Sequence, residues 1–417
     1  MFEQLFKRPR ALARQRNGPL AEERCRYLVH CASQQLARRT LQFIASYILI
    51  VAKALRLADR PGELIPRAEI EAEADRWANR QPKPPALRDV HRSWFRFAGQ
   101  ATRWLTFLGR LQPLATTPRP YAEYVVQFTD FMLRERGLSP QTAEYRCRTI
   151  HEFFARTEEA GLRLNTLTVA QVDELLARKI RDDGYARITI QTYASTLRAF
   201  FRYAEGCGWC RPGLANAIMA PRVFRHETLP IGPSWNDVNR VLAAQGDRPA
   251  DIRARALLML LAVYGLRAGE VVGLRLEDFD WQRQVLTIAQ SKRQKPRTYP
   301  LCRPVGDAVL RYLREVRPRS AWRQVFLILR APFRPLTRVG LGHVVSQRLH
   351  ALGLSLPHYG PHILRHACAT HLLEQGLSLK EIGDHLGHQS PETTRIYAKV
   401  DLVGLRTVAD FELEGLL

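Results

Sequence analysis

Two proline-bounded stretches, 113–120 and 221–233, interrupt the hydrophobic periodicity of this chain and limit what it can fold into. Such stretches are typical of linkers, because proline neither continues a helix nor donates a hydrogen bond to a sheet. The chain has 417 residues, which is more than one ordinary hydrophobic core contains. We therefore predict three domains, a helical extension over 1–112, a second helical domain over 116–222 and a third domain over 234–417.

The first segment closes with aromatic residues at helical spacing. They predict a helix whose stripe packs into a core rather than stacking on nucleic-acid bases. The stripe consists of Trp94, Phe95, Phe97, Trp104, Leu105, Phe107 and Leu108. The most apolar run of the chain, 43–52, is about half as long as the roughly 20 residues that a membrane span needs. We therefore expect no membrane association.

Helix signals dominate the second segment. Ser139 precedes a proline, a combination that can cap and open a helix. Thr168 and Gln171 have the spacing of a capping box, in which each side chain bonds the other residue's backbone. Leu197 and Phe200 contribute an apolar face to a later helix. These signals predict a segment of four or five helices.

The third segment combines helices with a short β region. An apolar helix is expected over 256–264, and helices resume from about residue 340. Between them, 285–288 and 298–301 are rich in β-branched and aromatic residues and flank a basic turn, which predicts a hairpin. The expected fold class is therefore mainly α with a small β-sheet (α+β).

The charge balance points to a polyanionic partner. Lys and Arg number 63 against 40 Asp and Glu, giving a formal net charge of +23. Such an excess is most often the footprint of nucleic-acid binding, although an anionic membrane surface or a ribosomal setting would give the same balance. The seven cysteines are scattered and odd in number, which fits free thiols in a reducing compartment. With no secretory signal in view, we expect a cytoplasmic protein.

The third segment also carries side chains suited to attack on a phosphodiester. A phosphodiester is anionic, and guanidinium groups neutralise it well because they bind its oxygens bidentately and stay charged. A nucleophile and an acid for the leaving oxygen complete such a site. The chain offers, in this order, Arg267, Lys292, His362, Arg365, His388 and Tyr397.

This ordered series resembles the catalytic signature of the tyrosine recombinase and phage integrase family. Residues 264–281 (YGLRAGEVVGLRLEDFDW) resemble its first catalytic box, and residues 362–400 (HILRHACATHLLEQGLSLKEIGDHLGHQSPETTRIYAKV) resemble its second. The second segment is similar to the family's helical core-binding (SAM-like) domain, whereas the first segment falls outside the resemblance. The resemblance implies that the core-binding and catalytic domains form a C-shaped clamp around double-stranded DNA, with an extra helical domain before them.

The resemblance also implies roles on the phosphate. Arg267 and Arg365 would grip the scissile phosphate, and His388 would hydrogen-bond it. Lys292 would protonate the leaving 5′-oxygen. Lys295 lies in the same basic turn, and the choice between the two lysines stays open.

Tyr397 is implied to be the nucleophile, forming a 3′-phosphotyrosyl bond and freeing a 5′-hydroxyl. A tyrosine hydroxyl has an ordinary pKa of about 10 and must lose its proton during attack. His362 would assist that proton transfer, and Glu270 would orient an arginine or the hairpin from behind the site. His366 is left out of the predicted site, as a residue that caps or packs.

The bond energy is kept in the tyrosyl ester, so the resemblance implies no cofactor, no metal and no ATP. His362 and His366 have a helical metal-ligand spacing but lack the glutamate of a zinc motif, so no metal site is predicted. A type IB-like topoisomerase and a non-catalytic DNA-binding accessory subunit remain alternative functions.

The resemblance further implies a homo-tetramer on two duplexes, with partner recombinases as an option. The basic N-terminal extension would suit an arm-type DNA binder or an oligomerisation module, and it favours a mobile genetic element. The apolar tail, 398–417, is expected to dock on a neighbouring protomer.

Overall fold

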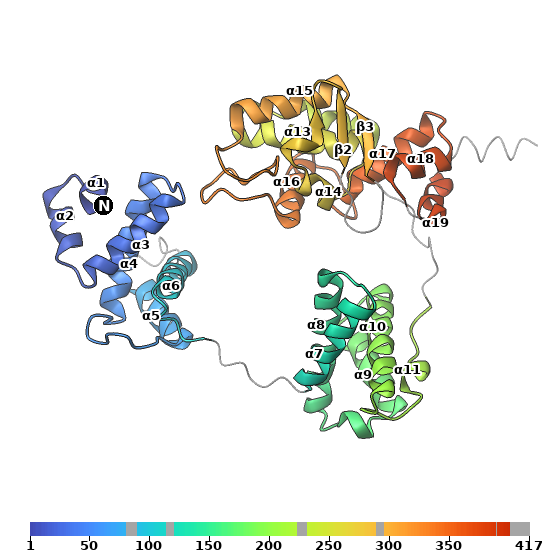
Figure 1. Ribbon diagram of the computed structural model, residues 1–417, viewed down its shortest axis with the longest axis horizontal. Helices are drawn as coiled ribbons and strands as arrows, with labels where there is room; N and C mark the ends of the chain where they lie inside the picture. Colours follow the sequence, from blue (N-terminus) through green and yellow to red (C-terminus); the bar gives the residue numbers. More distant parts are fainter. Residues whose placement is uncertain (81–89, 114–120, 223–231, 289–295, 389, 401–417) are drawn as a thin grey trace, which may run out of the picture. The chain divides into compact units, whose positions relative to one another are not determined.

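The computed structural model describes residues 1–80, 90–113, 121–222, 232–288, 296–388 and 390–400. It is mainly helical with one three-stranded sheet, which confirms the predicted fold class (Figure 1). Each of the three segments buries a hydrophobic cluster of its own. Residues 114–227 form a separate compact unit, while the division of the remainder into two domains stays a prediction. No helix in the described part of the chain is long and apolar enough to cross a membrane.

The N-terminal segment is entirely helical where the structure describes it. Its helices are α1 (Phe2–Leu5), α2 (Pro9–Arg16), α3 (Ala21–Ser33), α4 (Arg38–Ala54), α5 (Arg67–Asn79) and α6 (Val90–Phe107). Phe97, Trp104 and Leu105 of α6 are fully buried, as the aromatic stripe predicts. Phe95 and Phe107 instead have exposed fractions of 56% and 39%. A turn of about 100° per residue carries these two rings off the buried face of α6.

The middle segment confirms the predicted helix starts. Its elements are α7 (Ala122–Asp130), the π-helical turn η2 (Phe131–Glu135), α8 (Pro140–Glu159), the 3-10 turn η3 (Leu164–Thr166), α9 (Val169–Arg181), α10 (Arg187–Gly206) and α11 (Leu214–Ala217). The Ser139 hydroxyl accepts a backbone N–H of the first turn of α8 at 3.1 Å. Thr168 and Gln171 form the reciprocal capping box of α9. Leu197 and Phe200 of α10 are fully buried.

The third segment opens with helices. They are α12 (Trp235–Ala243), α13 (Pro249–Val263) and α14 (Ala268–Gly273), followed by the 3-10 turn η4 (Leu276–Asp278). Helix α13 has nine buried residues, seven of them in the continuous run 256–262, and its cluster forms the core of this segment. The short loop between α13 and α14 lies next to that core, so a charged residue placed there is held by a rigid neighbour.

An antiparallel sheet follows, with strand order β1 (Phe279–Asp280), β2 (Val285–Ile288) and β3 (Arg297–Pro300). Leu286 of β2 pairs with Tyr299 of β3, and both are buried. The predicted hairpin is therefore confirmed to within one residue. The tip of the hairpin, 289–295, lies outside the described residues.

Helices complete the segment. They are α15 (Arg303–Arg311), the π-helical turn η5 (Tyr312–Val316), α16 (Arg338–His350), α17 (His362–Glu374), α18 (Leu379–Leu386), α19 (Pro391–Thr394) and the 3-10 helix η6 (Arg395–Val400). Ser390, Pro391 and Glu392 are residue types that open a helix, and this pattern predicts one longer helix with Tyr397 about two turns into it. In the structure the Ser390 side chain makes no cap hydrogen bond, and the α-helix ends at Thr394. Tyr397 therefore lies on η6.

Candidate active site

Arg267 stands directly before α14, where the chain turns after α13. Gly265 allows this turn because its φ is +57°, and because a Cβ there would lie 2.4 Å from Leu386 Cδ2. The Arg267 backbone N–H donates to the Glu270 carboxylate at 2.8 Å, and its guanidinium donates to the same carboxylate at 2.9 Å. The start of α14 thus fixes both the backbone and the side chain of this arginine.

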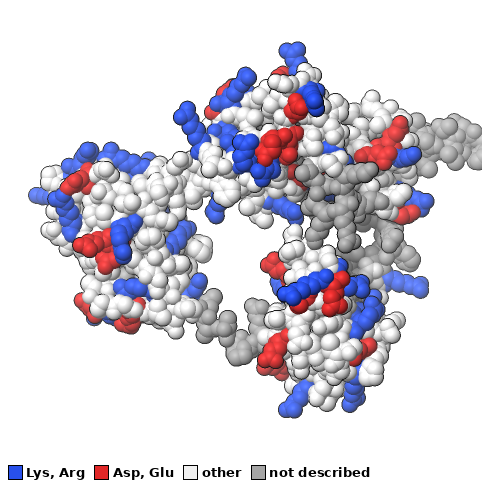
Figure 2. All heavy atoms as spheres, viewed as in Figure 1, with Lys and Arg blue, Asp and Glu red and all other residues white. Residues whose placement is uncertain are grey.

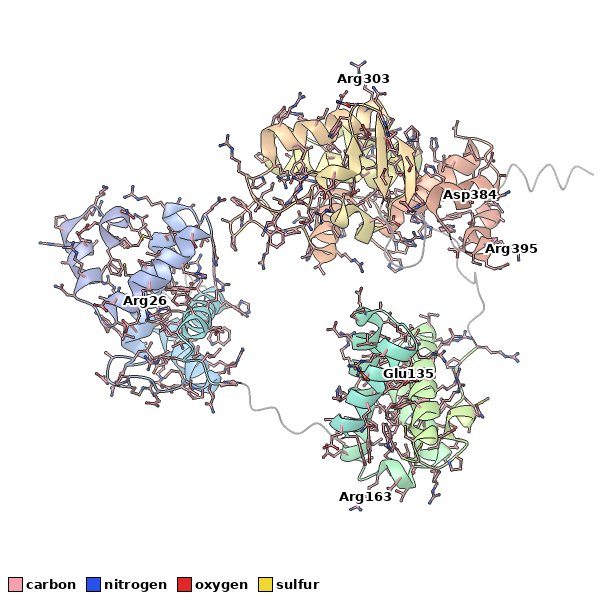
Figure 3. All side chains as sticks on the ribbon, in the orientation of Figure 1. Arg26, Glu135, Arg163, Arg303, Asp384 and Arg395 are labelled. Carbon is pink, nitrogen blue, oxygen red and sulfur yellow. The ribbon has the colours of Figure 1, made fainter. Side chains whose placement is uncertain are left out.

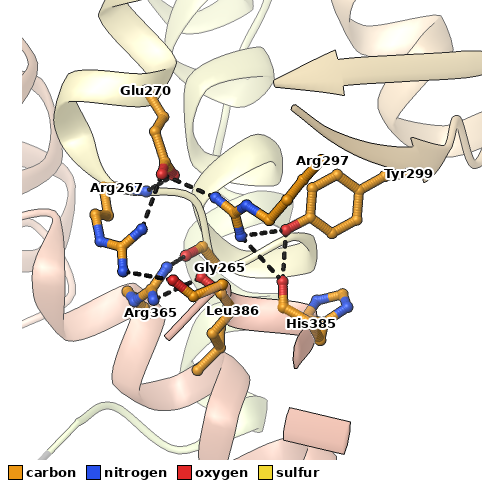
Figure 4. Close-up of polar contacts among 9 residues, drawn as sticks. Gly265, Arg267, Glu270, Arg297, Tyr299, Arg365, His385 and Leu386 are labelled. Atoms are coloured by element: carbon orange, nitrogen blue, oxygen red, sulfur yellow. Dashed lines mark hydrogen bonds and ion pairs between the residues drawn. The ribbon is translucent and has the colours of Figure 1, made fainter. Parts of the chain in front are cut away.

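Arg297, on β3, shares the same carboxylate. Its Nη2 donates to Glu270 Oε1 at 2.8 Å, and its Nη1 donates to the Tyr299 hydroxyl at 2.6 Å and to the His385 carbonyl at 3.2 Å (Figure 4). Its side chain is 15% exposed. Glu270 therefore links β3 to the start of α14. Below, Arg267, Arg297, Arg365 and Glu270 together are called the arginine cluster.

Arg365 projects from α17 and is buried, with 2% of its surface exposed. Its guanidinium donates to the Gly265 carbonyl and, at 2.8 Å, to the Leu386 carbonyl. A buried cation requires such partners, because water no longer solvates it. Burial, followed by the charge of Arg267, lowers the pKa of Arg365 to about 10, so it remains charged at neutral pH.

The end of α18 organises all three arginines. The carbonyl oxygens of residues 385–387 each accept a hydrogen bond from a different guanidinium, contributed by β3, α17 and the loop before α14. Carbonyls at a helix C-terminus lack intrahelical partners and carry partial negative charge, so they attract cations. Arg267 makes its bond to the Gly387 carbonyl at 2.9 Å. One turn of backbone therefore aligns three cations from distant parts of the sequence (Figure 4).

His388 follows this turn directly. Gly387 has a φ of +64°, and a Cβ there would lie 2.4 Å from Arg297 Nη1, so the guanidinium passes close to the backbone. The His388 Nδ1 atom and the Thr394 hydroxyl oxygen are 2.7 Å apart. Burial, followed by the charges of Arg365 and other neighbours, lowers the pKa of His388 to about 4. It is a neutral ring at pH 7, able to hydrogen-bond an anion.

Tyr397 is buried beside α17 and α18, with 2% of its surface exposed. Its hydroxyl lies 2.9 Å from Nδ1 of His366. Burial raises the pKa of Tyr397 to about 12, and the charge of Arg365 opposes that rise. Residues 390–400, which carry Tyr397, are called the tyrosine segment below.

The remaining predicted residues are His362 and Lys292. His362 is the first residue of α17 and is exposed, and its ring meets that of His366 edge-on at a centroid distance of 4.4 Å. Burial of the ring nitrogens, followed by Arg365 and Arg267, lowers the pKa of His362. Lys292 and its alternative Lys295 lie outside the described residues. The structure therefore groups Arg267, Glu270, Arg365, His388 and Tyr397 with His362 around α17 and the end of α18.

The charges of this site favour an anion. Three guanidiniums surround Glu270, and its carboxylate is bonded to two of them. The lowered pKa values of His362, His366 and His388 mean that these rings carry no charge at pH 7, so they do not add to the positive charge of the guanidiniums. Within the described residues, no group of three or more His, Cys, Asp or Glu side chains is placed to hold a metal ion. Positive charge in excess of negative charge suits a phosphodiester.

Sequence reasoning missed two residues of this site, Arg297 and His366. Arg297 stands next to the basic turn that holds the candidate lysines, but nothing in the local pattern separates it from neighbouring surface arginines. His366 directly follows Arg365, and its position one turn after His362 could have placed it on the same helix face. Only the fold brings it to Tyr397.

Comparisons with known proteins give the family of the chain. The phage integrase family matches residues 234–402, and the N-terminal SAM-like domain of phage integrases matches residues 125–206. The chain is 35% identical over 295 residues to the integrase/recombinase y4rA of Sinorhizobium fredii, covering 70% of this chain and 71% of that protein. It is 35% identical over 290 residues to the tyrosine recombinase XerC of Alcanivorax borkumensis, covering 68% of this chain and 91% of that protein.

A solved structure shows the same fold. The XerH site-specific recombinase, bound to a palindromic difH substrate after cleavage, matches with a TM-score of 0.52 and 19% identity. The match covers 69% of this chain and 84% of that one. The chain therefore belongs to the phage integrase family of tyrosine recombinases and is a site-specific recombinase.

Proposed function

We propose that this recombinase cuts and rejoins double-stranded DNA through a 3′-phosphotyrosyl bond at Tyr397, in the service of a mobile genetic element. The proposal rests on the end of α18, where the carbonyl oxygens of residues 385–387 each bond a different guanidinium immediately before His388. Fixed donors of this kind stabilise the charge that builds on phosphoryl oxygens in the transition state. The relative named integrase/recombinase supports integration as the biological context.

Each residue has a role in this proposal. Arg267 and Arg365 hold the non-bridging oxygens of the scissile phosphate, and His388 donates a further hydrogen bond. Tyr397 attacks phosphorus and gives up its hydroxyl proton, a transfer that His362 assists, while Lys292 protonates the departing 5′-oxygen. Rejoining is the reverse step, in which a 5′-hydroxyl of the partner duplex attacks the tyrosyl ester. The ester conserves the energy of the broken bond, so the reaction draws on neither ATP nor a metal cofactor.

The distribution of charge supports DNA as the substrate. Lys and Arg side chains lie on the visible face of all three segments, with acidic side chains among them (Figure 2). Arg26, Arg163 and Arg303, one in each segment, are exposed to solvent (Figure 3). With a net charge of +23, binding should weaken steeply as salt displaces the protein from phosphates.

Assembly belongs to the same proposal. Strand exchange joins two duplexes, so we propose a tetramer in the cytoplasm whose core-binding and catalytic domains clamp the DNA. Residues 1–112 would add arm-site DNA contacts or contacts between protomers, and 398–417 would dock on a neighbour. Removing 1–112 should lower affinity for flanking DNA in the first case and shift the tetramer to smaller species in the second.

Covalent capture tests the proposed chemistry. The full-length protein first selects its binding sequence from a random duplex pool, and that duplex is then nicked to trap cleavage. With a metal chelator present, we expect an SDS-resistant protein–DNA adduct from the wild-type chain. Tyr397→Phe, which keeps the ring and loses the hydroxyl, should bind the same duplex and form none. Binding without an adduct in the wild-type chain would contradict the proposal.

A further inference from the structure

The hydroxyl of Tyr397 has one hydrogen-bond partner among the described residues, and it is His366. The two atoms are 2.9 Å apart, and the ring centroids are separated by 5.7 Å. His366 lies one turn after the exposed His362 on α17, with the two rings in edge-on contact. His366 therefore sits between the exposed histidine and the buried tyrosine, and the mechanism described above gives it no role.

The charge states and the absence of another acceptor among the described residues give this hydrogen bond its direction. Burial raises the pKa of Tyr397 to about 12, so its hydroxyl is protonated at pH 7 and can donate. Burial, followed by the charges of His362 and Arg365, lowers the pKa of His366 to about 4, so its ring is neutral. A neutral ring carries its hydrogen on Nε2 or on Nδ1, and only the Nε2 form lets Nδ1 accept the hydroxyl hydrogen, which has no other acceptor among the described residues.

The other groups near the hydroxyl are poor proton acceptors. Arg365 is a cation with no lone pair to offer. Burial raises the pKa of the Cys368 thiol to about 12, and its Sγ lies 3.6 Å from the Val263 carbonyl, to which it donates. A protonated thiol that already donates elsewhere does not serve as a base. His362, to which the sequence analysis assigns proton transfer, contacts the ring of His366, whereas His366 itself contacts the phenol oxygen and has a lone pair to accept its proton.

We infer that His366 is a catalytic residue of this site and accepts the hydroxyl proton of Tyr397 during strand cleavage. The inference rests on the proposed function, because it takes Tyr397 as the nucleophile. A lone pair of the phenol oxygen forms the new O–P bond, and the P–O5′ bond breaks. The hydroxyl proton passes to His366 Nδ1, while the general acid of the site supplies a proton to the leaving 5′-oxygen. The reverse transfer regenerates the hydroxyl on rejoining.

The transfer accompanies bond formation rather than preceding it. A phenol beside a neutral imidazole keeps its proton, because the oxygen is much the stronger base. As the O–P bond forms, the oxygen loses electron density and its proton becomes acidic. Negative charge building on the phosphoryl group then stabilises the imidazolium. General-base catalysis of this kind contributes roughly 10²- to 10⁴-fold to a rate.

The substitution His366→Asn separates hydrogen bonding from proton transfer. An asparagine side-chain oxygen can occupy the position of Nδ1 and accept the hydroxyl hydrogen bond, but it cannot take the proton at neutral pH. On the nicked duplex selected by the full-length protein, we expect unchanged binding and single-turnover cleavage slowed by about 10²-fold or more. His371→Asn is the matched control, because His371 lies on the same helix but stacks on Trp235. It should cleave at the wild-type rate.

The same duplex with sulfur in place of the leaving 5′-oxygen (a bridging 5′-phosphorothiolate) then shows whether His366→Asn lacks a general base or a general acid. Sulfur leaves without a proton, so this substrate relieves a missing general acid but not a missing general base. We expect His366→Asn to stay slow on it. Recovery of the wild-type rate would overturn the inference by placing His366 at the leaving group. Cleavage by His366→Asn within threefold of the wild-type rate on the ordinary duplex would also overturn it.

Two further results distinguish a failure of this inference from a failure of the proposed function. If the wild-type chain forms no adduct on the duplex that it selects, the proposed function itself fails. If His366→Asn does not fold, ¹⁵N NMR of histidine-labelled wild-type protein takes its place. Neutral His366 with its hydrogen on Nε2, and an Nδ1 resonance that shifts in Tyr397→Phe, is the expected result. A doubly protonated His366 at pH 7 would overturn the inference, since it has no lone pair to accept a proton.

Discussion

The arginine cluster and the tyrosine segment are neighbours in one site but are held in different ways. Each guanidinium of the arginine cluster bonds at least two groups, and one of them is a carbonyl at the end of α18. The tyrosine segment consists of a four-residue α-helix and a 3-10 helix, and single side-chain bonds join it to His366 and His388. The cations are thus fixed by several hydrogen bonds each, whereas Tyr397 is buried in an apolar cluster and its hydroxyl has a single hydrogen bond that one substitution can alter.

The largest effect should come from Arg365→Ala. It removes a phosphate donor and leaves two carbonyls at helix ends without their partner, so cleavage should fall by about 10³-fold. The free energy of unfolding should fall by roughly 2–4 kcal/mol, because both lost bonds are charge-assisted and buried. Single-turnover cleavage and urea unfolding measure the two effects.

Arg267→Ala is the comparison variant, because the Arg267 side chain is 42% exposed. It should lose similar activity with less stability, and equal destabilisation by the two variants would contradict this account.

Glu270→Gln should have the next largest effect on cleavage. The amide keeps the shape of the side chain but no longer neutralises Arg267 and Arg297, so both guanidiniums can leave their positions. A small displacement of catalytic groups can slow a reaction by about 10- to 100-fold. Glu277→Gln is the matched control, because Glu277 bonds the exposed arginines Arg275 and Arg323 away from the cluster. Equal cleavage rates in the two variants would argue against a positioning role for Glu270.

Gly387→Ala probes the turn that joins the two regions. Its φ of +64° strains an alanine by about 1–2 kcal/mol, and the added methyl would also meet Arg297 at 2.4 Å. Gly376→Ala isolates the first effect, because Gly376 has a φ of +85° with open space around it. Thermal unfolding should show a loss in both variants, and cleavage should fall only in Gly387→Ala. A slower Gly376→Ala would mean that strain alone disturbs the site.

The last effect is on stability rather than on the cleavage rate, and it depends on pH. His366 and His388 have folded pKa values of about 4 against an ordinary 6.5, so the unfolded chain binds more protons between these values. Their contribution to stability should be fully present above pH 6.5 and lost as the pH falls toward 4. Urea midpoints at pH 7 and pH 5 measure this loss. His388→Asn should show a smaller loss than the wild-type chain, and an identical loss would show that His388 is not responsible.

Residue chemistry and spacing predicted much of this arrangement in advance. The capping signals at Ser139 and Thr168, the buried face of α10 and the hairpin depend on neighbours in sequence, so the sequence alone reveals them. The contacts of Arg297 and His366 depend instead on residues 88 and 31 positions away. The sequence also did not reveal that the α-helix before Tyr397 ends at Thr394, whose side chain bonds His388. The predicted catalytic roles themselves stay predictions until they are measured.

The central claim is that the Tyr397 oxygen forms the covalent bond to DNA. Mass spectrometry tests it most directly, on the adduct formed with the selected nicked duplex in the presence of a metal chelator. After digestion with nuclease and protease, we predict one modified peptide, with a nucleotide 3′-phosphate esterified to the Tyr397 oxygen. A nucleotide attached to any other residue, or a chelator that prevents the adduct from forming, would contradict the account.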